Sequence, residues 1–208
     1  PTATKTMYIP PYFAETNPQQ LLAFMQEFPF ALLVSAQNNI PTATHLPFVA
    51  ELRGETIVLL SHLAKNNPQH RQFAPHAEAL VVFQEPHAYV SPRHYEKLQN
   101  VPTWNYVAVH AYGTVHTVSA APDALALIEK MLHHFEPAYL QQWSNLPDAY
   151  KNGLLNGIVA FEITVTRLEG KKKLSQNKTE KERQNIIAAF TESPDALARR
   201  IAGFMQQL

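Results

Sequence analysis

Apolar residues along the chain follow a helical period first and a strand period afterwards. Between Asn17, which is suited to cap a helix, and Pro29, which ends one, apolar residues recur at helical spacing and predict a helix. Short apolar runs separated by turn residues then predict strands. The strands are expected at 30–35, 42–50 (interrupted by Pro47), 56–60, 79–83, 104–118 and 158–167. Further helices are expected at 123–135, 148–155, 179–190 and 195–207.

The order of these elements predicts an α+β fold that is mainly β. There is no alternation of strand and helix and no glycine-rich phosphate loop in a chain with only 6 Gly, which disfavours doubly wound nucleotide folds. Antiparallel strands in this number favour a small closed or split barrel flanked by helices. We expect one domain over 1–208, in which 168–208 is a basic connector followed by C-terminal helices.

Composition narrows the class of function. The chain has 208 residues, 46% of them hydrophobic, no Cys, and 17 basic residues against 17 acidic ones. The absence of Cys excludes disulfides, iron–sulfur ligation and thiol catalysis, and zero net charge argues against a protein that coats nucleic acid or membrane. Neither a signal peptide nor an apolar span of 18 residues is visible, so we expect a cytoplasmic protein that does not enter the membrane.

One polar stretch lies within a predicted strand and a second directly follows the next strand, and neighbouring strands would place both groups of anion-binding residues at one end of the sheet. The first, 42–47, places Thr42 and Thr44 on one strand face and His45 on the other. The second begins with Ser61 and continues through a cation to an Asn at a helix start, a combination that favours phosphate. Threonine is also an ordinary strand residue, and the second stretch also reads as a solvated loop with a helix cap. The second stretch runs from Ser61 to Arg71.

Two further stretches have a chemical and a structural interpretation. Trp104, Tyr106 and His110 share one face of a predicted strand, where they suit a flat heteroaromatic ring, a subunit interface or an ordinary core. The stretch 167–183 contains seven basic and three acidic residues, so it suits a solvated face, a phosphate-binding segment or a DNA contact. No HExxH motif and no GxSxG motif is present, and no metal site is expected.

Six segments resemble the PaiB family, described as FMN-binding negative transcriptional regulators. The match extends from Met7 to about Phe190, and the segments at 101–106 and 174–178 are the most specific. They are 7–13, 43–47, 62–68, 87–92, 101–106 (with Val109, His110 and Gly113) and 173–178. The resemblance implies a split β-barrel similar to that of pyridoxamine-phosphate oxidases, a homodimer, and FMN in a groove between the subunits.

The resemblance also assigns candidate cofactor residues. The FMN phosphate is expected at Thr42, Thr44, His45, Ser61, His62, Lys65, Asn67 and Gln69. A second subunit is expected to bring Trp104, Tyr106 and His110 toward the flavin ring, and Lys173, Gln176, Asn177 and Lys178 to close over it. No catalytic residue is assigned.

Three functions stay open from the sequence. The first is an FMN-binding negative regulator that acts directly on DNA or indirectly. The second is a flavin-dependent oxidoreductase, or a haem-handling enzyme on the same barrel. The third is an interaction protein whose cofactor site has decayed, because Glu85, Arg93 and His94 replace residues that are common in the family, while Lys65 stands where Arg is common.

Overall fold

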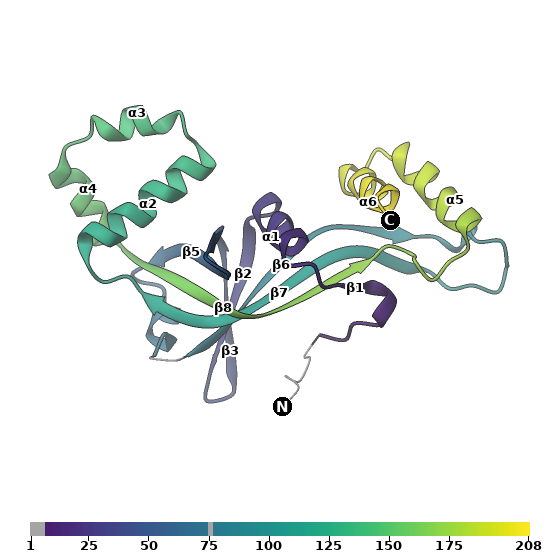
Figure 1. The fold of residues 1–208 in the computed structure, drawn as a ribbon, viewed down its shortest axis with the longest axis horizontal. Helices are drawn as coiled ribbons and strands as arrows, with labels where there is room; N and C mark the ends of the chain where they lie inside the picture. Colours follow the sequence, from purple (N-terminus) through teal and green to yellow (C-terminus); the bar gives the residue numbers. More distant parts are fainter. Residues whose placement is uncertain (1–6, 75–76) are drawn as a thin grey trace. The chain divides into compact units, whose positions relative to one another are not determined.

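The computed structural model of the protein describes residues 7–74 and 77–208, which form helices and one antiparallel sheet (Figure 1). The helices are α1 (Pro18–Glu27), α2 (Ala121–Phe135), α3 (Tyr139–Ser144), α4 (Asp148–Leu155), α5 (Glu180–Thr191) and α6 (Ala196–Gln206). The strands are β1 (Ala14–Glu15), β2 (Phe30–Gln37), β3 (Ile40–Pro47), β4 (Val49–Arg53), β5 (Thr56–Ala64), β6 (Glu78–Val90), β7 (Thr103–Thr117) and β8 (Ile158–Lys173). Short 3-10 helices are η1 (Pro11–Phe13), η2 (Pro68–Gln72) and η3 (Pro92–His94). None of the helices described is long and apolar enough to cross a membrane.

Strands β3 and β4 follow each other in the chain but stand at opposite ends of the strand order β3-β2-β6-β7-β8-β5-β4. Strand β3 pairs with β2 and β4 pairs with β5, both antiparallel. Only Phe48 separates β3 from β4, so the two ends of the sheet meet there and the sheet closes on itself. The predicted fold class, an antiparallel split barrel with flanking helices and a helical C-terminal extension, is confirmed.

The change of partner at Phe48 corrects the single strand expected over 42–50. Pro47 has no N–H group to donate to a ladder, and the Phe48 N–H donates to the carbonyl of Pro29 at 2.8 Å instead of to a strand. Phe48 itself is completely buried, with its ring 6.0 Å from that of Phe83 and 6.2 Å from that of Phe161. The corner of the barrel is therefore held by an aromatic anchor.

The described residues form two compact units that share strands β6, β7 and β8. Unit 1 contains 7–21, 84–109 and 169–208, and unit 2 contains 22–74, 77–83 and 110–168. Unit 2 is thus interrupted once by a segment of unit 1, and unit 1 is assembled from three separate segments.

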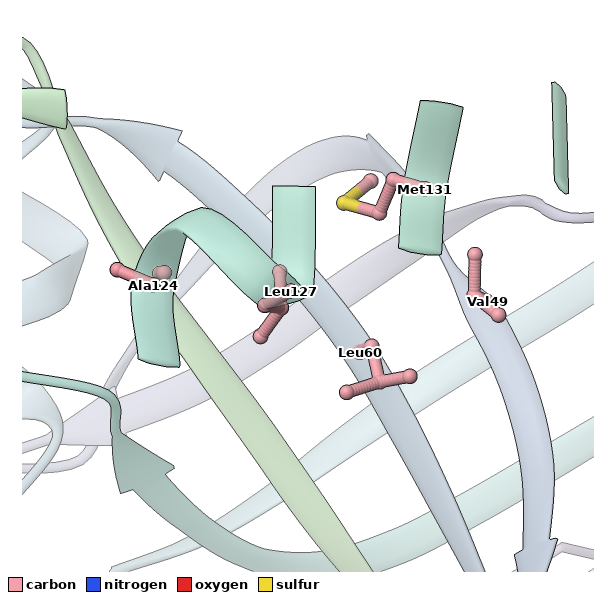
Figure 2. Close-up of a cluster of buried hydrophobic side chains, with 6 residues drawn as sticks. Val49, Leu60, Ala124, Leu127 and Met131 are labelled. Carbon is pink, nitrogen blue, oxygen red and sulfur yellow. The ribbon is translucent and has the colours of Figure 1, made fainter. Parts of the chain in front are cut away.

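Helix α2 covers part of the barrel in unit 2. Ala124, Leu127 and Met131 are its buried residues and recur at helical spacing, so they form one apolar stripe. They pack against Val49 of β4 and Leu60 of β5 (Figure 2). This contact fixes the helix on the strands that follow the barrel corner.

Unit 1 is held by its own core and by a short added strand. Strand β1 pairs with the last part of β8, with Ala14 opposite Lys171. Helices α5 and α6 pack against each other and contribute the fully buried Ile186 and Ile201. Thr179 caps α5 through a capping box with Glu182.

Three strands are longer than the sequence predicted. Strand β5 continues through Ala64, β6 continues to Val90, and β8 continues to Lys173, so the expected loops and charged connector begin later. Polar and charged side chains in these extensions concealed the strand period. Helix α3 was not expected at all, because its six residues are too few to show a period.

Candidate functional site

Strand β3 presents two threonine side chains inward and its other polar residues outward. Thr42 and Thr44 are half-buried, whereas Ala43 and His45 are exposed, as alternation along a strand requires. The exposed His45 ring stacks on Phe30 of the neighbouring strand, with 6.2 Å between ring centres and 19° between ring planes. The predicted separation of the threonines from His45 is confirmed.

The segment after β5 meets these threonines through side-chain amides. Gln69 is completely buried, and its Oε1 accepts a hydrogen bond from the Thr44 hydroxyl. Its Nε2 donates to the carbonyls of Leu33 and Thr42, each at 3.2 Å. Asn67 Nδ2 donates to the Thr44 hydroxyl at 2.9 Å. The structure therefore brings four of the predicted residues together: Thr42, Thr44, Asn67 and Gln69.

Two members of this network were missed from the sequence. Ser35 of β2 donates to Gln72 Oε1 at 2.6 Å, and Gln72 Nε2 donates to the Thr42 hydroxyl at 3.0 Å. We call the six residues the hydroxyl–amide cluster: Ser35, Thr42, Thr44, Asn67, Gln69 and Gln72. The spacing of Gln69 and Gln72 by three residues, one turn of η2, was the signal available in the sequence.

The remaining predicted residues of this stretch have different surroundings. Ser61 is completely buried in β5 and donates to the carbonyl of Pro47 at 2.7 Å, so its hydroxyl supports the barrel corner. The Nδ1 atom of His62 is buried without a hydrogen-bond partner among the described residues, and burial lowers the pKa of this imidazole. Lys65 is exposed and lines a cavity of about 500 Å³ with Ser119 and Asn152.

The predicted aromatic face of β7 alternates with buried residues, as expected. In unit 1, Trp104 is 51% exposed, and its ring lies 5.9 Å from that of His87 and 5.7 Å from that of Tyr89. Tyr106 is half-buried on the same face. In unit 2, the rings of His110 and Tyr112 are 6.4 Å apart.

The predicted residues at the end of β8 and after it lie in unit 1, and all but Gln176 line a cavity of about 320 Å³. Lys173 Nζ donates to the Thr103 hydroxyl and, at 2.6 Å, to the carbonyl of Trp104. Lys178 and Asn177 line the same cavity. Gln176 does not line it. Its amide holds the turn, accepting from the Leu174 N–H at 2.7 Å and donating to the Lys172 carbonyl at 2.6 Å.

The sequence pattern of a protein family described as "Putative FMN-binding domain" matches residues 7–167, which is most of the chain. The chain belongs to this family. The predicted membership is confirmed, and it gives the protein a flavin cofactor. The match ends one residue before unit 2 ends, so the last segment of unit 1 lies outside it.

Two relatives match the FMN-binding chain over nearly its whole length. Protease synthase and sporulation protein PAI 2 of Bacillus subtilis is 36% identical over 203 residues, covering 96% of this chain and 97% of its own. An uncharacterized protein of Emericella nidulans is 27% identical, with 97% of each chain covered.

Solved structures share the fold at low sequence identity. The FAD and heme binding protein from Mycobacterium smegmatis has a TM-score of 0.60 at 15% identity, covering 77% of this chain and 73% of its own. The flavocytochrome Anf3 from Azotobacter vinelandii has a TM-score of 0.63 at 12% identity, covering 81% and 74%. These likenesses establish the barrel fold.

The donor chemistry of unit 2 fits the phosphate of FMN. The Thr44 hydroxyl accepts from Asn67 while donating to Gln69, and Asn67 Nδ2 carries a second proton. In the chain Lys65 stands two residues before Asn67 and His62 five residues before it; Lys65 lines the cavity of Ser119 and Asn152, and Nδ1 of His62 has no hydrogen-bond partner among the described residues. Hydroxyl, amide and ammonium donors are the groups that bind phosphate oxygens.

Proposed function

We propose that the protein is an FMN-binding regulator of the PaiB type, with the FMN phosphate bound at the hydroxyl–amide cluster of unit 2. The single observation that carries this assignment is the joining of Thr44 on β3 to Asn67 and Gln69 beyond β5. Two segments separated by more than 20 residues in sequence thereby share one set of donors. When bound, FMN supplies an isoalloxazine ring that accepts and releases electrons.

Within this proposal the chain's residues divide into two roles. Thr42, Asn67, Lys65 and His62 are the candidate phosphate contacts, and Thr44 orients Asn67 because its own proton is donated to Gln69. Gln69 is a positioning residue, because its side chain is completely buried and its side-chain amide donates hydrogen bonds to carbonyl groups of β2 and β3. His45 is exposed on the outer face of β3, where it suits a contact with a second subunit.

Assembly and regulation belong to the same proposal. We infer a cytoplasmic homodimer in which each subunit contributes to a flavin site of the other, with Trp104, Tyr106 and His110 as candidate ring contacts. Regulation is inferred to be indirect, through a bound small molecule or a partner protein. The relative from Bacillus subtilis, named as a sporulation protein, supports the regulatory role.

Comparing FMN with riboflavin tests the phosphate site directly, because the two ligands differ only in the phosphate. We expect the purified protein to show flavin absorbance bands, or to acquire them with FMN, and to bind riboflavin more weakly. Thr44→Val should lower FMN affinity roughly tenfold and leave riboflavin affinity nearly unchanged, because Asn67 Nδ2 loses the acceptor that orients its second proton for a charge-assisted hydrogen bond to the phosphate.

Thr56→Val is the matched control, because Thr56 is an exposed threonine on β5 outside the cluster. Equal FMN affinity in wild type and Thr44→Val would contradict the phosphate assignment. A Soret band in the isolated protein, with no flavin uptake, would contradict the cofactor assignment. Light scattering with and without FMN measures the molecular mass in solution, and so tests the dimer independently of the phosphate and cofactor assignments.

A further inference from the structure

Unit 1 contains a cavity whose cations have no carboxylate partner in the part of the chain that the structure describes. The cavity of about 320 Å³ is lined by Lys171, Lys173 and Lys178 together with Tyr8, Tyr95 and Asn105, and we call it the lysine pocket. Among the described residues that line it, none is Asp or Glu. The flavin-phosphate assignment in unit 2 uses none of these residues.

Each lysine ammonium group in the pocket donates to neutral oxygens. Lys171 Nζ donates to the carbonyl of Tyr8 at 2.8 Å, and Lys178 Nζ donates to Oδ1 of Asn100 at 3.1 Å. Lys173 contacts a hydroxyl and a carbonyl, as described above. Burial, and then the charge of Lys171, lower the pKa of Lys173. Ammonium groups gathered in this way favour the binding of an anionic group in the pocket, because removing them from water costs free energy unless an opposite charge compensates.

Lysines that lie just outside the pocket have carboxylate partners. Lys172 Nζ lies 2.7 Å from a carboxylate oxygen of Glu15, and Lys181 Nζ lies 2.9 Å from one of Glu96. Carboxylates are therefore available in this part of the chain. The lining of the pocket therefore differs from its surroundings in lacking carboxylates.

Tyr95 supplies a second, independent indication of a ligand. It lines the pocket and is 8% exposed, and its hydroxyl is buried without a hydrogen-bond partner among the described residues. An unsatisfied buried hydroxyl costs about 1–3 kcal/mol, so a ligand oxygen that accepts its proton is favoured. The buried Asn105 amide also lines the cavity, and Ser175 donates to its Oδ1 at 3.0 Å.

The pocket walls are aromatic as well as cationic. Lys178 Nζ lies 3.8 Å from the centre of the Tyr95 ring, and Lys171 Nζ lies 5.5 Å from that of the Tyr8 ring. Aromatic walls suit a flat ring, and a volume near 320 Å³ is at the small end of ligand pockets, which run from about 300 to 1,000 Å³.

We propose that the lysine pocket is a second ligand site, which binds a small flat-ringed molecule carrying one carboxylate or phosphate group. Lys171, Lys173 and Lys178 take the acidic oxygens, Tyr95 donates its hydroxyl to one of them, and the tyrosine rings flank the ligand ring. Such a site would give the protein a small-molecule input separate from its flavin.

Calorimetry on the FMN-saturated protein tests this proposal with phenyl phosphate and benzoate as acidic probes and benzyl alcohol as the neutral one. We expect both acids to bind, the alcohol not to bind, and added salt to weaken binding. The acid that binds more tightly identifies phosphate or carboxylate as the preferred group. The same titrations on the protein without FMN should give the same affinities, whether or not the phosphate assignment in unit 2 holds.

Lys173→Met should lower the affinity for the more tightly bound acid roughly tenfold to a hundredfold, because it removes a charged donor while keeping most of the length of the side chain. Lys172→Met is the matched control, since it changes the same net charge on the adjacent residue of β8. Tyr95→Phe should also weaken the acid while leaving the free energy of unfolding equal or higher, because it removes an unsatisfied hydroxyl. This variant keeps the test valid if Lys173→Met fails to fold.

Three results would overturn the proposal. They are the absence of acid binding at millimolar concentration, an equal loss in Lys172→Met and Lys173→Met, and competition between the acids and FMN. The last would instead make Lys173, Asn177 and Lys178 part of the flavin site, as the family resemblance implies.

Discussion

The Thr44 hydroxyl donates a 2.5 Å hydrogen bond to Oε1 of Gln69, a residue whose side chain has no exposed surface. This bond joins β3, an end strand of the barrel, to the segment that follows β5. Since Gln69 also holds the carbonyls of Leu33 and Thr42, one amide organises two adjacent strands. The cluster therefore depends on a residue that no ligand needs to touch.

Replacing Gln69 with Leu should destabilise the protein. Leucine is similar in size, but the Thr44 hydroxyl and the carbonyls of Leu33 and Thr42 lose their hydrogen bonds to the amide. We expect the free energy of unfolding to fall by about 1–3 kcal/mol, measured by urea denaturation. FMN affinity should fall as well, since Thr44 loses its orientation. Gln99→Leu, at an exposed position, is the control, and an equal loss in both variants would argue against the positioning role.

Two glycines should respond oppositely to substitution by alanine. A Cβ at Gly113 would lie 2.4 Å from the carbonyl oxygen of Thr164, so Gly113→Ala should lower the free energy of unfolding by about 1–3 kcal/mol. A Cβ at Gly153, inside α4, would meet nothing within 4 Å, so Gly153→Ala should raise it by about 0.5–1 kcal/mol. Thermal or urea denaturation of both variants distinguishes these outcomes.

Stability should decline in mild acid partly through His62. Burial lowers the pKa of this imidazole below its value of about 6.5 in the unfolded chain, so the unfolded state binds more protons as the pH falls. The contribution of His62 is therefore lost progressively below pH about 6.5. We expect His62→Gln to flatten the fall in unfolding free energy between pH 7 and 5, and the exposed His133→Gln to leave it unchanged.

The N-terminus of α5 should be sensitive to loss of its cap. The Thr179 hydroxyl accepts from the Glu182 N–H at 3.2 Å, and the Glu182 carboxylate accepts from the Thr179 N–H at 3.2 Å. Thr179→Ala should lower the free energy of unfolding by about 1 kcal/mol. Thr179→Ser keeps the hydroxyl and should restore most of this loss, and identical unfolding curves for the two variants would rule out the cap as the cause.

The basic stretch 167–183 should bind DNA weakly, because several of its cations are buried, stacked on a ring or paired with a carboxylate, and so are not free on the surface. The Arg167 guanidinium lies 3.6 Å from the centre of the Tyr112 ring, Lys171 is 8% exposed, and Arg183 pairs with Glu180. Charges engaged in this way release few counterions on binding a phosphate backbone. We expect no mobility shift with duplex DNA at 150 mM salt, and a shift that weakens steeply with salt would restore direct DNA contact.

Residue patterning predicted the barrel but not the lengths of its strands. Apolar alternation located β2, β7 and the first half of β8, because their buried faces carry apolar residues. The last part of β8 was read as a connector because Lys171 and Lys173 conceal the strand period. Their positions became explicable only when the partner strand β1 and the pocket were visible.

The sequence predicted part of the phosphate cluster, but the structural reason that brings its residues together differs from the one expected. Thr44 and Asn67 were expected to meet because their strands were taken as neighbours, yet β3 pairs with β2 and β5 pairs with β4 and β8. They meet because the barrel closes and η2 returns to β3. Ser35 could not be found, since the partner of a buried serine is set by tertiary contacts alone, whereas the three-residue spacing from Gln69 was a sequence signal for Gln72.

The division of unit 1 into three segments has a consequence for synthesis. Its first segment leaves the ribosome long before the residues after 168. These later residues supply the lysine-rich end of β8 and helices α5 and α6. Unit 2 has all its residues once Leu168 has been made, so it can complete its barrel first. The lysine pocket cannot form until Lys178 has emerged, so any binding there must follow completion of the barrel.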